Sequence, residues 1–436
     1  MTSLKIGVCG LGTVGSGVIK LFNDHQGLIQ QRCNADLQLV HIGARRDNAD
    51  CDTSRYRVSR DIFEVVRDPE VDIVVELIGG TTVARDLVTQ AIQAGKHVVT
   101  ANKALIAEFG NELIALAEQA QVALRFEAAV AGGIPVIKVL RESLAANVVS
   151  GVAGIINGTG NFILTEMANA GRSFDDVLAE AQALGYAEAD PTFDIDGTDA
   201  AHKLVILASI AFGIPLDANA PIMEGIDTVT PEDLNFAKEL GFCVKHLGIA
   251  RRCGDAIDLR VHPTLIPSSR QIARVDGVLN AVMIEADAVG EIVLTGPGAG
   301  SLPTASSVCS DLLDLGKILN HTKIDPAPIL GVPSDQLQAL PLVPRDEVAG
   351  VWYLRLVVED RPGVMAEITG LLSERGISIE SLIQRPPVAG SSQVTVVILT
   401  DSVACGPLDA AICDMESLPA LSGSVVRLRV ESFKEV

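Results

Sequence analysis

Residues 4–15 read Leu4-Lys-Ile-Gly-Val-Cys-Gly10-Leu-Gly12-Thr-Val-Gly15, which is a short apolar strand followed at once by a G-x-G-x-x-G turn. Apolar residues then recur at helical spacing, so the turn joins a strand to a helix. The glycines allow a tight turn, a close approach of the backbone to a pyrophosphate, and close helix–strand packing. The N-terminus of the helix would face the phosphates. We therefore predict a dinucleotide-binding domain that holds its cofactor at Gly10, Gly12 and Gly15.

Strands and helices continue to alternate after this turn. Strands are expected at residues 37–43, 71–78, 97–101 and 123–127, and helices at residues 84–94 and 111–121. This alternation predicts an α/β domain of the Rossmann type, whose parallel sheet binds ligands beyond the carboxyl ends of its strands. Thr100 and Lys103 would lie at that edge, where Lys103 could face cofactor and substrate. A loop lysine is more often exposed to solvent, and that interpretation stays open.

The second strand ends in Ala44-Arg45-Arg46, where an NAD-specific site usually has an acidic residue for the ribose 2′-hydroxyl. Arginine suits a 2′-phosphate instead. We therefore favour NADP as the cofactor, held by Arg45 and Arg46. Two surface arginines at a strand end would look the same, and Asp47 leaves NAD open.

A long acidic loop, residues 181–198, leads into a very apolar helix. Asp199 and Lys203 are four residues apart at the start of this helix, so both side chains lie on one face. The helix stays apolar nearly all round as far as Phe212, which is typical of a buried helix. A lysine at the edge of a core is suited to proton transfer. The plainer interpretation is a solvated loop that ends in a surface ion pair.

Another candidate is the turn of small residues after Glu127, which runs to Pro135. Its carbonyls and the Glu127 carboxylate could surround a hard cation. A simple turn at a domain junction is the more frequent use of such a sequence.

Composition limits the partners of this chain of 436 residues, which carries a formal net charge of -21. That charge argues against nucleic acid and against an anionic membrane surface, so we expect a small-molecule partner. The sequence has no signal peptide pattern and no apolar stretch long enough to span a membrane. The eight cysteines have no metal-binding spacing, and we predict a cytoplasmic protein with reduced thiols.

The chain is long enough for several domains. Beyond residue 150 the pattern changes to an α+β type, and a second glycine-rich turn ends at Gly300. Five prolines between residues 324 and 350 suggest a linker, and the remaining segment has the order β-α-β-β-α-β, which is ferredoxin-like. The predicted boundaries are 1–135 together with about 301–322 for the dinucleotide domain, 136–300 for the substrate domain, 323–350 for the linker, and 351–436 for the C-terminal domain.

The acidic loop resembles, position by position, the signature of the homoserine dehydrogenase family. The matching residues are Ala181, Gly185, Tyr186, Asp190, Pro191, Asp194, Ile195, Gly197, Asp199 and Lys203. Three further segments are similar to that family: residues 10–15, 100–105 and 154–163. The C-terminal segment resembles an ACT domain, with Asp360-Arg-Pro-Gly363 at its first turn. Because no kinase-sized segment precedes the glycine-rich turn, the resemblance is to the monofunctional form.

The resemblance implies the NAD(P)-dependent interconversion of L-homoserine and L-aspartate 4-semialdehyde, a step toward threonine, methionine and isoleucine. Lys203 would be the proton donor and acceptor, and Lys103 an auxiliary charge or relay. Glu188 and Asp199 would bind the polar groups of the substrate. Two alternatives stay open, namely a dehydrogenase of another amino acid or semialdehyde, and an amino-acid-binding sensor that keeps a dinucleotide domain.

The family also implies contacts outside the reaction centre. For the cofactor, the implied residues are Thr13, Val14, Arg45, Gly185 and Gly300. For a monovalent cation such as Na⁺, they are Glu127 and the backbone of Val130, Gly132 and Ile134. The ACT resemblance suggests threonine as an effector, and we expect a homodimer or homotetramer.

Overall fold

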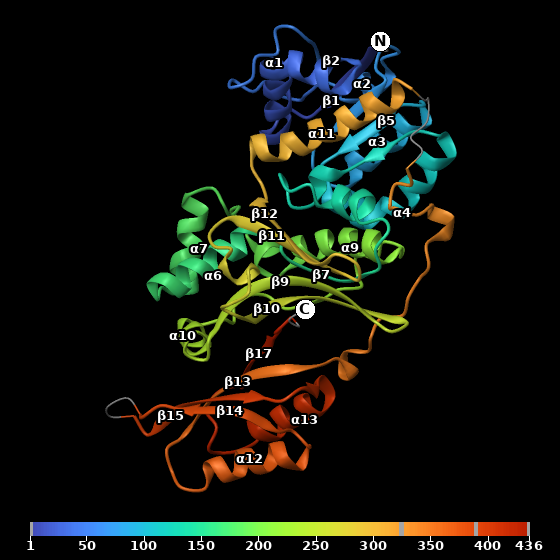
Figure 1. Cartoon of the computed structure of the whole chain (residues 1–436). Coiled ribbons are helices and arrows are strands. Elements are labelled where there is room, and N and C mark those ends of the chain that lie inside the picture. Colours follow the sequence, from blue (N-terminus) through green and yellow to red (C-terminus); the bar gives the residue numbers. More distant parts are fainter. Residues whose placement is uncertain (1–2, 322–326, 388–390, 434–436) are drawn as a thin grey trace. The chain divides into compact units, whose positions relative to one another are not determined.

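The computed structural model describes residues 3–321, 327–387 and 391–433. The chain forms two compact units, each built from three segments (Figure 1). The first unit comprises Met1–Gly158, Asp199–Pro221 and Val278–Leu340. The second comprises Thr159–Thr198, Ile222–Gly277 and Pro341–Val436. The first residues of the predicted linker, 323–326, lie outside the described residues.

The first unit contains a six-stranded parallel sheet with the order β3-β2-β1-β4-β5-β6. Its strands are β1 (Ser3–Cys9), β2 (Asp36–Gly43), β3 (Arg57–Ser59), β4 (Ile73–Glu76), β5 (His97–Thr100) and β6 (Leu124–Arg125). Its connecting helices are α1 (Thr13–Cys33), α2 (Phe63–Arg67), α3 (Thr82–Gln93) and α4 (Lys103–Ala120). This is the strand order of a doubly wound dinucleotide-binding sheet, as predicted.

The prediction placed the start of α4 too late, at residue 111. Asn102 caps the helix much earlier, because its side chain accepts a hydrogen bond from the backbone N–H of Leu105 at 3.1 Å. The cap fixes Lys103 as the first helical residue. The predicted strand 123–127 was too long, because a 3₁₀ turn, η1 (Glu127–Ala129), follows the two residues of β6.

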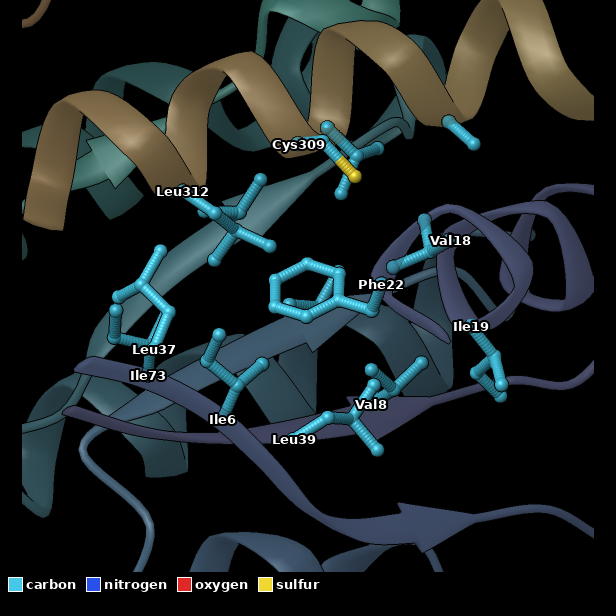
Figure 2. Close-up of a cluster of buried hydrophobic side chains, with 14 of the residues drawn as sticks. Ile6, Val8, Val18, Ile19, Phe22, Leu37, Leu39, Ile73, Cys309 and Leu312 are labelled. Carbon is cyan, nitrogen blue, oxygen red and sulfur yellow. The ribbon is translucent and has the colours of Figure 1, made fainter. Parts of the chain in front are cut away.

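A later helix, α11 (Ser301–Leu319), completes the core of this sheet. Figure 2 shows Leu312 and Cys309 of α11 with Phe22 of α1, above the strand residues Ile6 and Val8. All five side chains are buried. Truncating a buried leucine or phenylalanine typically lowers the free energy of unfolding by about 2–5 kcal/mol. Helix α11 is therefore an integral part of this domain, although it lies far from the strands in the sequence.

The remainder of the first unit has three antiparallel strands with the order β12-β11-β7. Their bounds are β7 (Val149–Ile155), β11 (Leu279–Ala286) and β12 (Gly290–Pro297), and this part also holds α5 (Val136–Lys138), η2 (Val139–Ser143), α9 (Thr198–Phe212) and η4 (Ser334–Gln336). Asp199 and the eleven residues after it in α9 are buried as far as Ile210. The apolar sequence of this helix therefore predicted its burial correctly.

The second unit combines a helical layer with one long mixed sheet, and two core clusters fill it. Its helices outside the C-terminal domain are α6 (Gly158–Ala170), α7 (Phe174–Ala183), α8 (Thr192–Ile195), α10 (Pro231–Glu239) and η3 (Ile272–Arg274). The strands there are β8 (Ile222–Met223), β9 (Phe242–Cys253) and β10 (Ala256–Pro267). Strands β9 and β10 pair over their whole length as an antiparallel hairpin.

The C-terminal domain has the predicted β-α-β-β-α-β order. Its elements are η5 (Arg345–Glu347), β13 (Ala349–Glu359), α12 (Val364–Glu374), β14 (Ile379–Gln384), β15 (Gln393–Thr400), β16 (Val403–Ala404), α13 (Cys405–Glu416) and β17 (Val426–Val430). Its sheet is not isolated, because β17 pairs in parallel with β10 through Thr264–Arg429 and Leu265–Val430. Backbone pairing thus joins this domain to the β9–β10 hairpin, which the sequence did not predict.

Candidate active site

The glycine-rich turn between β1 and α1 has the geometry that the motif requires. Gly10 has φ of 111°, and a Cβ atom there would lie 2.4 Å from the carbonyl oxygen of Leu77. A Cβ atom at Gly15 would lie 2.1 Å from the carbonyl oxygen of Gly10, whereas one at Gly12 would meet nothing within 4 Å. The first and third glycines are therefore needed for packing, and Gly12 leaves open space. Thr13 begins α1, so the unpaired N–H groups of the first helical turn adjoin that space.

A cavity of about 980 Å³ borders this turn, which is near the upper end for small-molecule sites. Its wall includes Gly10, Gly12, Arg45, Arg46 and Gly79. Both arginines are exposed. Asp47, which left NAD open, is held by Arg60 through two hydrogen bonds of 2.8 Å. The charge of this wall is therefore set mainly by the arginines.

A second hollow of about 930 Å³ also borders Gly12, with Thr13 and Ser301 among its lining residues. Gly300 has φ of 116° and directly precedes α11. The predicted cofactor residues Gly12 and Thr13 therefore border this hollow, and Gly300 directly precedes its lining residue Ser301. Val14 is half-buried in the first turn of α1.

The carboxyl edge of the sheet is organised by a buried glutamate that the sequence analysis missed. Thr100 donates a hydrogen bond to Glu76 at 2.6 Å and accepts one from the backbone N–H of Asn102 at 3.0 Å. Burial raises the pKa of Glu76, and hydrogen bonds from Thr100 and from the backbone of Ile78 oppose that rise. The Thr100 hydroxyl thus donates and accepts hydrogen bonds within the protein. This hydrogen-bond network holds the turn that directly precedes Lys103.

Lys103, Asp199 and Lys203 meet in the first unit. The Lys203 ammonium donates to Asp199 at 2.6 Å and to the carbonyl oxygen of Ile156 at 2.7 Å. Lys103 reaches the other oxygen of the same carboxylate at 2.7 Å. Asn157 donates to Asp199 at 2.9 Å. One carboxylate therefore bridges two lysines that come from α4 and α9.

The burial of this cluster differs between its two lysines. The Lys203 side chain is 11% exposed and that of Asp199 is 5% exposed, whereas Lys103 is 36% exposed. Burial by itself would raise the pKa of Asp199, but Lys203 and Lys103 together hold that pKa well below its usual range. Asp199 therefore stays ionised at any working pH. The interpretation of the Asp199–Lys203 pair as a surface ion pair is wrong, because both groups are buried.

Glu188 and Gly185 belong to the second unit. Both are exposed, and they lie in the turn that follows α7. Gly185 has φ of 75°, so a side chain there would be strained. The carbonyl oxygen of Glu188 accepts a hydrogen bond from Gln182 at 3.1 Å.

The predicted cation ligands form a compact, buried turn in the first unit. The Glu127 carboxylate accepts hydrogen bonds of 2.9 Å from the backbone of Ile137 and of Lys138. Burial, and then the nearby Asp311, raise the pKa of Glu127 to about 7. The carbonyl oxygen of Gly132 accepts from Ser307 at 2.6 Å, and that of Ile134 accepts from a backbone N–H at 2.8 Å. Val130 is buried beside them.

Two functional candidates escaped the sequence analysis. Glu76 is the final residue of β4 and precedes a Gly79-Gly80 turn, which is a signal that could have been used. Asn157 follows β7 directly and lies within a segment already noted as similar to the family. Neither gave a spacing that pointed to its partner, because each contact joins distant segments of the chain.

A doubly wound sheet with a glycine-rich turn, beside a buried lysine–carboxylate cluster, defines a dinucleotide-dependent oxidoreductase. Residues 10–127 match the model of the homoserine dehydrogenase NAD-binding domain, residues 135–313 match that of homoserine dehydrogenase, and residues 352–416 match the ACT domain. The chain therefore belongs to the homoserine dehydrogenase family. This membership confirms the predicted activity, the ACT domain and the role in amino-acid biosynthesis.

Relatives of known name agree with this assignment. A homoserine dehydrogenase of Pseudomonas aeruginosa is 52% identical over 433 residues, covering 99% of this chain and 100% of the relative. The crystal structure of a homoserine dehydrogenase from Thiobacillus denitrificans matches with a TM-score of 0.93 and 49% identity, covering 99% of both chains. A hyperthermophilic archaeal homoserine dehydrogenase in complex with NADPH matches with a TM-score of 0.60 and 28% identity, covering 72% of this chain and 97% of the other.

Among the described residues, the longest helices lack the run of apolar residues that crossing a membrane would need. All eight cysteines are free.

Proposed function

We propose that Lys203 moves the proton in the interconversion of L-homoserine and L-aspartate 4-semialdehyde. The observation that carries this proposal is the short contact of the Lys203 ammonium with an ionised, buried Asp199. A bound nicotinamide supplies or takes up the hydride. In the direction of homoserine, the Lys203 ammonium donates a proton to the aldehyde oxygen. In the other direction, its neutral amine accepts the hydroxyl proton.

Lys103 and Asp199 have supporting roles in this proposal. Asp199 accepts from both lysines and keeps their positive charges close together. Lys103 is the more exposed of the two, so it is suited to exchange protons with solvent. A carboxylate has further acceptor positions, which leaves Asp199 able to bind a polar group of the substrate. The exposed carboxylate of Glu188 suits the substrate ammonium.

The test is steady-state turnover of Lys203→Ala with homoserine and with each nicotinamide cofactor. We expect kcat to fall by about 10²–10⁴-fold, with cofactor binding and the fold retained. Lys245→Ala is the matched control, because the Lys245 ammonium is also buried and donates to a carbonyl at 2.7 Å and to a carboxylate at 2.8 Å. Normal turnover in Lys203→Ala, or an equal loss in Lys245→Ala, would refute the assignment.

NADP is the cofactor that we propose from the charge of the cavity wall. Arg45 and Arg46 suit a 2′-phosphate, and Arg60 already neutralises Asp47. Gly10, Gly12, Thr13, Val14 and Gly15 would hold the pyrophosphate, and Gly300 and the Thr100 edge of the same unit would extend the site. The family resemblance adds Gly185 as a further cofactor contact. The archaeal relative with bound NADPH agrees with this preference.

A monovalent cation such as Na⁺ is proposed at Glu127 and the carbonyls of Val130, Gly132 and Ile134. Oxygen ligands suit a hard cation, and a positive ion would keep the Glu127 carboxylate ionised. Within the described residues, no cluster of three or more His, Cys, Asp or Glu side chains is arranged for a metal, so a mixed carboxylate–carbonyl site is the better candidate. Activity that is identical in Na⁺, K⁺ and tetramethylammonium salts would refute it.

The regulatory and cellular proposals rest on the family and on the sequence. We propose threonine as an effector of the ACT domain, a homodimer or homotetramer as the assembly, and the cytoplasm as the location, which suits eight free cysteines. The boundaries 1–135 with 301–322, 136–300, 323–350 and 351–436 stay a proposal. Threonine titration of the activity and sedimentation of the full chain test the first two.

A further inference from the structure

A small pocket in the second unit lies where β8 and β10 meet elements of the C-terminal domain. Its lining includes Arg260, Arg345, Arg427 and Arg429. Arg260 and Arg429 are only 4% and 5% exposed. Two buried guanidinium groups therefore face one small space, which places positive charge in a region with little water.

Each of the two buried arginines has at least one N–H donor from which no described residue accepts a hydrogen bond. Among the described residues, Nε and Nη1 of Arg260 and Nη1 of Arg429 have no hydrogen-bond partner. Buried polar groups in native proteins are nearly always paired, so such donors call for an explanation. Donors that converge on a pocket and lack a protein partner indicate a ligand that supplies acceptors.

The charges around the pocket do not balance. Asp258 pairs with Arg260, while Asp409 and Glu224 both pair with Arg427. Arg429 has an aromatic neighbour instead, since its guanidinium lies 4.3 Å from the centre of the Trp352 ring. Arg345 is exposed to solvent, so its charge is screened by water. Arg429 is therefore the buried guanidinium of this pocket that lacks a carboxylate among the described residues, and one anion would neutralise it.

The start of α13 adds to this field. The helix begins at Cys405, which lines the pocket, and its N-cap residue Ala404 offers no side-chain cap. Helix N-termini favour anions. His262 also lines the pocket, and its pKa is lowered to about 4 by burial and then by Arg260. It is therefore neutral near pH 7 and leaves the charge balance unchanged.

We propose that this pocket, which we call the arginine pocket, binds one small monovalent anion between Arg260 and Arg429. Its volume of about 20 Å³ has room for about one water-sized group. A halide ion fits entirely, and the carboxylate head of a larger molecule fits with the rest of that molecule outside. Both share the chemistry that guanidinium groups recognise.

Occupation of the arginine pocket would reinforce the joint between the C-terminal domain and the β9–β10 hairpin. Arg260 belongs to β10 and Arg429 to β17, and these two strands pair at Thr264–Arg429. An anion held by both arginines therefore adds a second link beside that backbone pairing. Anion concentration would thus control how firmly the C-terminal domain is attached.

Thermal unfolding of the full chain tests this site. At constant ionic strength, replacing methanesulfonate, whose three-oxygen head is larger than one water-sized group, by chloride or by formate should raise Tm by about 1–3 °C, because a ligand that binds only the folded state stabilises it. The anion that gives the larger rise in Tm identifies the ligand. A larger rise in chloride indicates a halide site, and a larger rise in formate indicates a carboxylate site. Arg429→Met should abolish the rise. The matched control Arg375→Met should keep it, because Arg375 is exposed and pairs with Asp414 in the same domain.

A second measurement covers the case in which Arg429→Met does not fold. Crystals of the unmodified full chain are soaked in bromide, and anomalous scattering is collected at the bromine edge. We expect a peak within hydrogen-bond distance of both Arg260 and Arg429. Absence of that peak together with absence of a formate effect, or an equal Tm rise in Arg429→Met, would overturn the proposal.

Discussion

Two groups of cations in this molecule differ in how their positive charges are neutralised. In the first unit, Lys103 and Lys203 share the Asp199 carboxylate at 2.7 and 2.6 Å. In the second unit, Arg260 and Arg429 face a pocket with donors that no described residue accepts from. A buried cation is costly unless it is paired. The lysines share an internal counter-ion, whereas Arg260 pairs with Asp258 and Arg429 needs an external anion.

The difference suggests why each type of side chain stands where it does. A lysine can lose its proton and take part in acid–base chemistry, so an internal carboxylate that holds it in place is useful. An arginine keeps its charge at any working pH and offers several donors in a fixed plane. The first group is therefore suited to move a proton and the second to hold an anion.

The largest expected effect comes from removing the internal counter-ion. Asp199→Ala leaves two ammonium groups that repel each other, so each should give up its proton more easily and Lys203 should lose its position. We expect kcat/KM to fall by about 10²–10³-fold, and the alkaline limb of the pH–rate profile to move to lower pH.

A matched control is available at the other buried lysine. Asp276→Ala removes the carboxylate that lies 2.8 Å from Lys245, and kcat/KM should change by less than about twofold if the effect belongs to the reaction site. Comparable losses of kcat/KM in Asp199→Ala and Asp276→Ala would show that these carboxylates support activity only by stabilising the fold, and that Asp199 has no special role in the reaction.

The sequence allowed the first group to be predicted in part. The four-residue spacing of Asp199 and Lys203 and the apolar helix after them were sufficient to place both side chains on one face, with Lys203 at the edge of a core. They left a surface ion pair open. The contact of Lys103 with the same carboxylate depends on where α4 and α9 meet, and no local pattern carries that information. Asn157 was missed for the same reason.

The arginine pocket could not be predicted at all. It depends on the parallel pairing of β17 with β10, and a sequence does not reveal which strand edge will receive a partner. Strand β9 was also missed. It contains Lys245 and His246, which interrupt its apolar pattern, although both are buried in the fold. By contrast, the glycine-rich turn was predictable because its constraints are local.

The second prediction concerns acid stability at the arginine pocket. Burial lowers the pKa of His262 to about 4, so between about pH 6.5 and 4 the unfolded chain binds a proton that the folded chain does not. Stability must therefore fall as the pH drops through that window. His262→Gln should reduce this loss by on the order of 3 kcal/mol, measured by urea unfolding from pH 7 to pH 4.

An anion in the pocket should weaken this effect, because a negative charge beside His262 favours its protonation. The benefit of His262→Gln should then be smaller in chloride or formate than in methanesulfonate. His246 is the control, since burial lowers its pKa to about 4 as well but it does not line the pocket. The same anion dependence in His246→Gln would contradict a local effect at the arginine pocket.

The smallest expected effect belongs to Arg45, which is exposed to solvent. Water screens its charge, so its interactions are weaker than those of the buried cations. Arg45→Ala should weaken NADPH binding by about tenfold, which corresponds to one charge-assisted hydrogen bond, and should change NADH binding by less than about twofold. Fluorescence titration with each cofactor measures both values, with Arg32→Ala in α1 as a control that should change neither. Equal losses for the two cofactors would mean that Arg45 recognises a feature common to both, and the preference for NADP would then lose its support.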